Sequence, residues 1–250
     1  MVSEKIIVRG IPYDSVTLPE ALDSIRGFLS SGKTNTVVTP NAEIAQRCVE
    51  DETIRSLVTD ADLVIPDGAG VVLAARILGT PLKCKVPGCE LGELIVSRAA
   101  DEGFRIFFLG GKPGVAALAE EKLREKYPGF HTVGVLDGYF SKEGPENEAV
   151  LAEIRESHAD ILFVCLGFPA QERWMHDNRG NLPAVRVMLG LGGSLDCYAG
   201  TVRRAPKVFI RLGLEWFYRL LCQPSRAWRM RKLPKFLIGT VFCRLTGRKG

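Results

Sequence analysis

Short apolar segments alternate with helical patterns along most of this chain of 250 residues. Arg105–Leu109 and Asp160–Leu166 are the clearest of these segments, and each leads into a turn that contains glycine. Strands that are apolar on both faces and separated by helices pair in parallel, with helices covering both faces of the sheet. The sequence therefore predicts an α/β fold with a mostly parallel sheet. The other expected strands are Lys5–Val8, Asn35–Val38, Leu63–Ile65, Thr132–Leu136 and Val185–Leu191.

Helix-start signals follow several of the expected strands. At Thr39-Pro40-Asn41 the sequence predicts a helix with Thr39 as N-cap and Pro40 as its first residue, because proline is favoured at that position. The expected helices are Leu18–Leu29, Ala42–Val49, Glu52–Thr59, Gly68–Leu78, Glu90–Glu102, a segment ending near Lys126, Glu146–Ser157, a segment beginning at Ala170, and Pro206–Leu221.

Charge is distributed unevenly between the body of the chain and its end. From Arg203 onward there are thirteen Lys and Arg residues and one acid, Glu215, so this part carries +12 and the first 202 residues carry −8. A length of 250 residues suits one large domain with an appendage. We therefore expect an α/β core over residues 1–200 and a basic, helical C-terminal appendage over residues 201–250. Such a basic segment favours partners that carry phosphates.

Cysteine and histidine usage argues against disulfides and zinc. The seven cysteines are odd in number and form no C-x-x-C pair, and the three histidines are scattered, which favours reduced thiols in the cytoplasm. We see neither a signal peptide nor an apolar run of about 18 residues that could span a membrane. The expectation is a cytoplasmic protein with no metal site and no cofactor.

The basic tail interleaves cations with large apolar side chains. Trp228, Met230, Leu233 and Phe236 lie among arginines and lysines, and an apolar stretch follows. Apolar anchors beside cations suit an anionic bilayer surface better than a nucleic-acid groove. We therefore expect peripheral association with the inner face of the cell membrane and no binding of nucleic acid. A plainly solvated tail is the alternative, and the residues leave open whether the chain forms a homo-oligomer.

Four loops follow the ends of expected strands, namely Thr39–Asn41, Asp67–Gly70, Gly110–Gly114 and Gly167–Glu172. In a parallel sheet such loops gather along the carboxyl edge, where ligands bind. Glycines at a helix start let a phosphate approach backbone N–H groups, so Gly110–Gly114 is a candidate diphosphate cradle. An ordinary tight turn is the alternative interpretation, and the P-loop pattern is absent.

Asp67 is the acidic residue at the tip of one of these loops. It is either a general base or a helix N-cap. A helix N-terminus stabilises the carboxylate, so a base at this position needs an apolar surround or closure around the substrate. Asp60-Ala-Asp62 imitates a metal-binding D-x-D motif, but it precedes its strand and so belongs to the opposite edge of the sheet.

Six blocks between about Ile6 and Trp228 occur in the order typical of one enzyme family. With them the chain resembles the WecG/TagA/CpsF glycosyltransferases, glycosyltransferase family 26. The blocks are Thr39-Pro40-Asn41-Ala42-Glu43, Asp67-Gly68-x-Gly70-Val71-Val72, Phe108-Leu109-Gly110-Gly111, Leu166-Gly167-x-Pro169-x-Gln171-Glu172, Ala199-Gly200-x-x-x-Arg204-Ala205-Pro206 and Leu214-Glu215-Trp216-x-x-Arg219-Leu220.

The resemblance implies a Rossmann-like α/β fold of the GT-E type. It also implies an inverting, metal-independent reaction that transfers a sugar from a UDP-sugar to a lipid-diphosphate-linked sugar. In the TagA branch, N-acetylmannosamine passes to undecaprenyl-diphosphate-linked N-acetylglucosamine for wall teichoic acid. UDP-N-acetylmannosaminuronic acid and UDP-glucose are alternative donors. Asp67 matches the family's proposed base, and Thr39 and Asn41 its substrate-contacting pair, with Thr39 also expected to be catalytic. The other residues implied to bind substrate are Lys85, Gly110, Gly111, Gln171, Glu172, Arg219, Arg226 and Arg229.

The sequence also departs from the family pattern. Lys85 stands where arginine is usual, Glu90 where aspartate is common, and Cys197 where an aromatic residue usually follows Asp196. Lysine keeps the positive charge but loses the bidentate geometry of arginine, which bears on the identity of the sugar. Two rival functions remain at this stage: a nicotinamide-dependent oxidoreductase, although no full glycine fingerprint is present, and a non-catalytic module that binds membrane surfaces.

Overall fold

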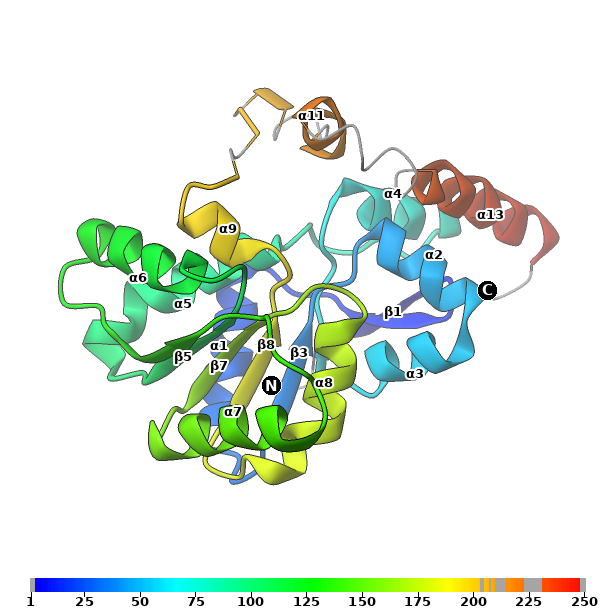
Figure 1. Cartoon of the computed structure of the whole chain (residues 1–250). Coiled ribbons are helices and arrows are strands. Elements are labelled where there is room, and N and C mark those ends of the chain that lie inside the picture. The colour runs from blue at the N-terminus through cyan, green and yellow to red at the C-terminus, as the bar shows by residue number, and fades with distance from the viewer. Residues whose placement is uncertain (1–2, 203–204, 207, 210–214, 223–230, 248–250) are drawn as a thin grey trace. The chain divides into compact units, whose positions relative to one another are not determined.

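The structure is a computed structural model that describes residues 3–202, 205–206, 208–209, 215–222 and 231–247 (Figure 1). The chain divides into two units. One unit combines Leu18–Val38 with Gly88–Arg203, and the other combines Val2–Thr17, Thr39–Pro87 and Arg204–Gly250.

The first unit is built on a parallel sheet, as the apolar strand runs predicted. Its strands lie in the order β3-β8-β7-β5-β6, and each strand is parallel to its neighbours in this order. All residues of β3, β5, β7 and β8 are buried, which explains why their sequences lack polar alternation. The strands are β3 (Asn35–Val38), β5 (Ile106–Gly110), β6 (Thr132–Leu136), β7 (Ile161–Cys165) and β8 (Val187–Gly190).

Aromatic side chains fill the centre of this unit. Phe108 on β5 lies opposite Phe163 on β7, and their rings stack with centroids 5.3 Å apart. Phe130 closes the cluster, 6.1 Å from the Phe108 ring. All three side chains are buried, so the register of β5 and β7 is fixed by close aromatic packing.

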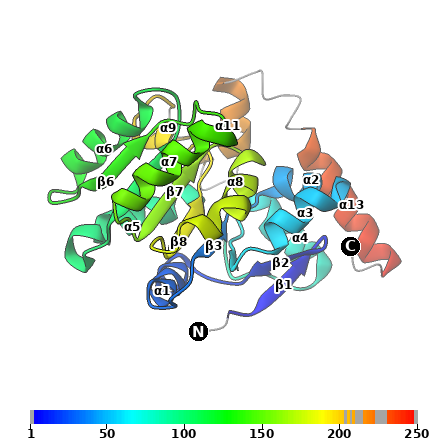
Figure 2. The same cartoon turned by 60° about the horizontal axis from the view of Figure 1, so that its bottom comes forward.

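Helices cover both faces of this sheet, as expected (Figures 1 and 2). The helices α1 and α5 lie on one face and α7 and α8 on the other. This arrangement confirms the predicted Rossmann-like α/β fold. The helices of the unit are α1 (Leu18–Leu29), α5 (Gly88–Glu102), α6 (Val115–Lys126), α7 (Gly144–Glu156), α8 (Ala170–Asn178) and α9 (Ser194–Tyr198), with a 3₁₀ turn, η1 (Arg179–Asn181), after α8.

The second unit begins with an antiparallel hairpin. β1 (Lys5–Val8) pairs with β2 (Ile11–Asp14), and the turn residues Arg9 and Gly10 both have positive φ, 53° and 80°. Positive φ at both turn residues suits the twist of a two-residue hairpin. β2 was not among the predicted strands, because its four residues include a proline and are too few for a clear alternation.

The rest of the second unit is mainly helical. It contains the two-residue strand β4 (Leu63–Val64) and the helices α2 (Ala42–Glu50), α3 (Glu52–Thr59), α4 (Ala69–Leu78), α11 (Glu215–Cys222) and α13 (Lys232–Thr246). Helix α13 agrees with the expected helical appendage, although its bounds were not predicted. The predicted helix Pro206–Leu221 lies partly outside the described residues. Within the described part of the chain, no helix is both long enough and apolar enough to cross a membrane.

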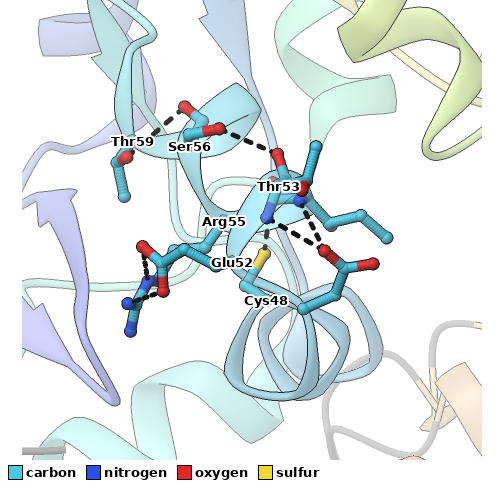
Figure 3. A network of polar contacts seen from close by, with 8 residues as sticks. Cys48, Glu52, Thr53, Arg55, Ser56 and Thr59 are labelled. Atoms are coloured by element: carbon cyan, nitrogen blue, oxygen red, sulfur yellow. Dashed lines mark hydrogen bonds and ion pairs between the residues drawn. The ribbon is translucent and has the colours of Figure 1, made fainter.

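A single aspartate separates α2 from α3. Asp51 ends α2 and caps α3, and its carboxylate accepts hydrogen bonds from the backbone N–H groups of Thr53 (2.9 Å) and Ile54 (3.2 Å). Buried Cys48 of α2 lies against the start of α3 (Figure 3), with its Sγ 4.0 Å from the Ile54 carbonyl oxygen. The cap and this contact break the helical pattern into two helices that pack together.

Candidate active site

Asn41 starts helix α2. Its Oδ1 accepts hydrogen bonds from the backbone N–H groups of Glu43 (3.0 Å) and Ile44 (3.1 Å). The prediction that Thr39 is the N-cap, with Pro40 as first helical residue, is therefore wrong. Asparagine is the better cap because its longer side chain reaches two amides at once from extended backbone. Half-buried Thr39 lies two residues before the cap.

Asp67 is not the N-cap of α4. That position belongs to Gly68, with φ of 88° and ψ of 155°, and it makes no side-chain cap hydrogen bond. The interpretation of Asp67 as an N-cap is thus wrong, because a glycine in a conformation that other residues rarely adopt intervenes between the carboxylate and the helix. Asp67 is half-buried and lies one residue before this N-cap.

The first turns of α2 and α4 lie in close contact. A Cβ added to Gly68 would lie 3.8 Å from Asn41 Cβ, and one added to Gly70 would lie 2.9 Å from Ala42 Cβ. Only small residues allow this approach. The structure therefore brings Asp67 and Asn41 together at the starts of two touching helices.

Two adjacent residues of β2 support these helix starts. The hydroxyl of Tyr13 donates to the Pro40 carbonyl (3.2 Å), and the carboxylate of Asp14 accepts from the Val64 N–H (2.7 Å). Burial raises the pKa of the Tyr13 phenol well above its usual value, and the charges of Cys48 and Asp67 raise it further. Tyr13 is thus within electrostatic reach of Asp67. The sequence prediction missed both supporting residues because it missed β2.

The segment that contains Lys85 is joined to the same loop by a backbone hydrogen bond. The N–H of Val86 donates to the carbonyl of Pro66 at 2.9 Å, which ties the segment containing Lys85 to the residue before Asp67. The Lys85 side chain is half-buried. The structure therefore adds a cation-bearing segment to the loop that carries Asp67.

Gly110 is the last residue of β5 in the first unit, and Gly111 follows it. Their φ values are 135° and 74°, and a Cβ on Gly110 would overlap the Cys165 carbonyl. The Gly111 N–H donates to that same carbonyl at 3.2 Å, so it is already used within the sheet edge. A diphosphate at this loop would instead have to use amides nearer the start of α6, which has Gly114 at its N-cap.

Gln171 and Glu172 are both buried, with 3% of each residue exposed. Gln171 Oε1 accepts from the Gly192 N–H (2.9 Å), and its Nε2 donates to Glu172 Oε1 (2.9 Å). A Cβ on Gly190 would lie 2.9 Å from Gln171 Nε2, so the glycine makes room for this amide. Gln171 thus joins the start of α8 to the loop after β8, and a direct contact with substrate stays a prediction.

An exposed tyrosine at this edge was not among the predicted residues. The loop after β6 is held by the Gly138 N–H, which donates to the Gly111 carbonyl (2.9 Å), and by Lys142 Nζ, which donates to the Gly138 carbonyl (2.9 Å). Tyr139 projects from this anchored loop with 69% of its surface exposed. The Asp137–Tyr139 sequence after a strand was the available signal, since aromatic residues on anchored loops are suited to binding.

The comparison with protein families decides the class of this protein. The model described as the glycosyl transferase WecG/TagA/CpsF family matches residues 6–250. The chain belongs to this family. A glycosyl transferase is an enzyme, which sets aside both the non-catalytic membrane module and the nicotinamide-dependent oxidoreductase.

Two curated relatives have the same name, N-acetylglucosaminyldiphosphoundecaprenol N-acetyl-beta-D-mannosaminyltransferase. The protein from Bacillus spizizenii is 36% identical over 214 residues, covering 86% of this chain and 81% of the relative. The protein from Bacillus subtilis (strain 168) is 33% identical over 232 residues, covering 92% of this chain and 89% of the relative. The similarity therefore extends over most of each protein.

The residues expected to bind substrate in this glycosyl transferase fall in both units. Thr39, Asn41, Asp67 and Lys85 belong to the second unit, and the Gly110–Gly111 and Gln171–Glu172 pairs to the first. Arg219 lies in α11, while Arg226 and Arg229 lie outside the described residues, so the arginine predictions remain untested. Among the described residues, no three His, Cys, Asp or Glu side chains are grouped to hold a metal ion.

Proposed function

We propose that this glycosyl transferase moves N-acetylmannosamine from UDP-N-acetylmannosamine to undecaprenyl-diphosphate-linked N-acetylglucosamine, for wall teichoic acid or a related surface polysaccharide. The observation that carries the proposal is the similarity to two enzymes named for this acceptor and this sugar, over 81% and 89% of their lengths.

The proposed reaction is a single inverting displacement. Asp67 takes the proton from the attacking hydroxyl of the acceptor sugar, and that oxygen forms a bond to the anomeric carbon of the donor. The bond between the anomeric carbon and the diphosphate oxygen breaks at the same time, and UDP leaves with the bonding electron pair. We assign Asn41 and Thr39, which lie at or just before the touching helix start, the task of orienting the acceptor beside the base.

Charge on the departing UDP needs stabilisation. The N-terminus of α6 offers backbone amides and the positive end of a helix dipole, and Lys85 offers a cation on the segment tied to the Asp67 loop. We assign the arginines of the appendage the same electrostatic task, since arginine binds phosphates in bidentate fashion. Gln171 and Glu172 shape the loops around the donor in this proposal.

Helix α13 supplies a surface for the membrane, where a polyprenyl-linked acceptor resides. Ile238, Val241, Phe242 and Leu245 are exposed, and their i, i+3, i+4, i+7 spacing places them on one face. Exposed cations lie on the same helix, among them Lys235 and Arg244. We infer peripheral binding to an anionic bilayer, with the enzyme on the inner face of the cell membrane.

The decisive experiment measures UDP release by the full-length protein in the presence of a chelator. The substrates are UDP-N-acetylmannosamine and a lipid-diphosphate-N-acetylglucosamine analogue, with reactions lacking acceptor as control. Acceptor-dependent release supports the proposal. Parallel reactions with UDP-N-acetylmannosaminuronic acid and UDP-glucose test the alternative donors, which the lysine at position 85 keeps open. Release with one of these donors alone would overturn the proposed sugar and leave the reaction class intact.

A further inference from the structure

Helix α13 packs on the two helices that carry the candidate site. It contacts both α2 and α4 along their lengths (Figures 1 and 2). Phe236, Thr240 and Cys243 are the buried residues of α13, and their spacing defines one inner face. The exposed apolar side chains of the proposed membrane surface lie on other positions of the same helix. The inner face of α13 therefore has a separate structural task.

Leu233, in the first turn of α13, lies against the start of α4. A Cβ added to Gly70 would lie 2.8 Å from Leu233 Cδ1 and 2.9 Å from Ala42 Cβ. Gly70 is three residues after Asp67, and Ala42 directly follows Asn41. Leu233 and Ala42 thus both lie against Gly70, within one helical turn of Asp67 and Asn41.

Ion pairs fix the first turn of α13 at this position. Lys232 and Lys235, which flank Leu233 in the sequence, both bind the carboxylate of Glu50, the last residue of α2. The Lys235 Nζ–Glu50 Oε1 distance is 2.7 Å. These hydrogen bonds lower the pKa of Glu50 to about 2. Because Lys232 and Lys235 lie on either side of Leu233 in the sequence, their ion pairs with Glu50 set the register of α13 on α2.

The other end of α13 is attached to α4. Arg244 Nη1 donates to the carbonyl of Leu78 at 3.2 Å, at the C-terminus of α4, where a cation also complements the helix dipole. A Cβ on Gly79 would lie 3.4 Å from Arg244 Nη1, so the guanidinium lies directly over the end of α4. Helix α13 is therefore anchored to α2 at one end and to α4 at the other.

We propose that Leu233 is a positioning residue for the reaction, because it sets how the first turns of α2 and α4 meet and thereby the placement of Asp67 relative to Asn41. The inference rests on the proposed function, in which Asp67 is the base and Asn41 contacts substrate. Displacement of a base by about 1 Å costs up to about 100-fold in rate. A shift in these helix starts reduces turnover without removing any group that binds the donor.

The test compares Leu233→Ala with Cys243→Ala in the full-length protein. Both truncate the inner face of α13, but Cys243 is ten residues further along the helix, about 15 Å from Leu233. For Leu233→Ala we expect kcat to fall about 10-fold, with the KM for the UDP-sugar changed by less than about twofold. The apparent pKa on the acid side of the kcat–pH profile should also change in Leu233→Ala. The conservative variant Leu233→Met should restore turnover. Cys243→Ala should retain normal kcat.

A second readout does not depend on activity. Amide hydrogen exchange should accelerate at residues 42–45 and 69–72 in Leu233→Ala and stay unchanged there in Cys243→Ala. Unchanged exchange and kcat within twofold of wild type in Leu233→Ala would overturn the proposal, as would equal losses in both variants. Inactive wild-type protein with every UDP-sugar would instead refute the proposed function, and the exchange data would still decide whether Leu233 holds the two helix starts.

Discussion

Tyr13 and Asp14 are neighbours on β2, yet they hold two different segments of the candidate site. Tyr13 binds the Pro40 carbonyl, next to the cap of α2, and Asp14 binds the Val64 N–H on the strand that leads to Asp67. Adjacent residues of a strand point to opposite faces, so one short strand can support both segments. The hairpin at the N-terminus therefore contributes to the geometry of a site whose chemistry lies 25 to 55 residues later.

Tyr13→Phe should destabilise the protein and slow the reaction. The change leaves the Pro40 carbonyl without its buried donor, at a cost of about 1–3 kcal/mol, and loosens the segment before Asn41. Urea unfolding and UDP release measure the two effects. Tyr139→Phe is the matched control for stability, because it removes the same hydroxyl from an exposed side chain. Equal stability of Tyr13→Phe and wild type would contradict the assigned hydrogen bond.

Asp67→Asn should abolish most of the turnover. Loss of a general base lowers the rate by about 100-fold to 10,000-fold. Loss of a helix N-cap does not add to this effect, because Gly68 and not Asp67 is the N-cap of α4. Steady-state kinetics measure the turnover, and thermal unfolding checks that the variant is folded. Asp60→Asn, at the exposed end of α3, is the control and should behave as wild type. Near-normal turnover by Asp67→Asn would show that another group is the base.

Glu50→Gln should reduce stability in a manner that depends on pH. The pKa of Glu50 is lowered from 4.5 to about 2 by Lys232 and Lys235, so the folded state favours the ionised acid. Its contribution is complete above the unfolded value and disappears as the pH falls from about 4.5 toward 2. The difference in unfolding free energy between wild type and Glu50→Gln should therefore shrink over that range. A difference that stays constant from pH 6 to pH 2 would argue against the ion pair.

Gly110→Ala should strongly destabilise the protein. The added Cβ would overlap the Cys165 carbonyl, and the backbone has a φ of 135°, which alanine rarely adopts. Gly27→Ala is the control, since this helical glycine has nothing within 4 Å of the added Cβ and should gain about 0.5–1 kcal/mol. Denaturant titration of both variants should give changes of opposite sign, and changes of the same sign would refute the packing argument.

Phe242→Glu should weaken binding to vesicles that contain anionic lipid. The substitution places an acid in the exposed apolar face of α13, where it opposes both insertion and attraction to the lipid charge. Val49→Glu, an exposed position on α2, is the control for added charge. Vesicle co-sedimentation measures binding. Equal loss in both variants would indicate a general effect of charge and would contradict a membrane surface on α13.

Local signals predicted the candidate acid but not its surroundings. Asp67 stands out in the sequence as an acid between an apolar strand and two glycines, and the carboxyl edge of a parallel sheet is a place for function. Whether it caps α4 depended on one backbone conformation, the positive φ of Gly68. Pattern alone does not reveal which of several neighbouring residues adopts such a conformation. Likewise, that α2 is capped by Asn41 and not by Thr39 depends on where the extended backbone ends and the helix begins.

The sequence by itself determined the parallel sheet and its helices. Strands that are buried on both faces, such as Ile161–Cys165, are continuous apolar runs, and here such runs alternate with helical patterns. Only the tertiary structure decided the pairing of β2 with β1 and the packing of α13 against α2 and α4. Four residues carry too little periodicity to identify a strand, and contacts such as Leu233 with Gly70 join positions far apart in the chain. Such contacts depend on how faces fit together in space, which the order of residues along one segment does not encode.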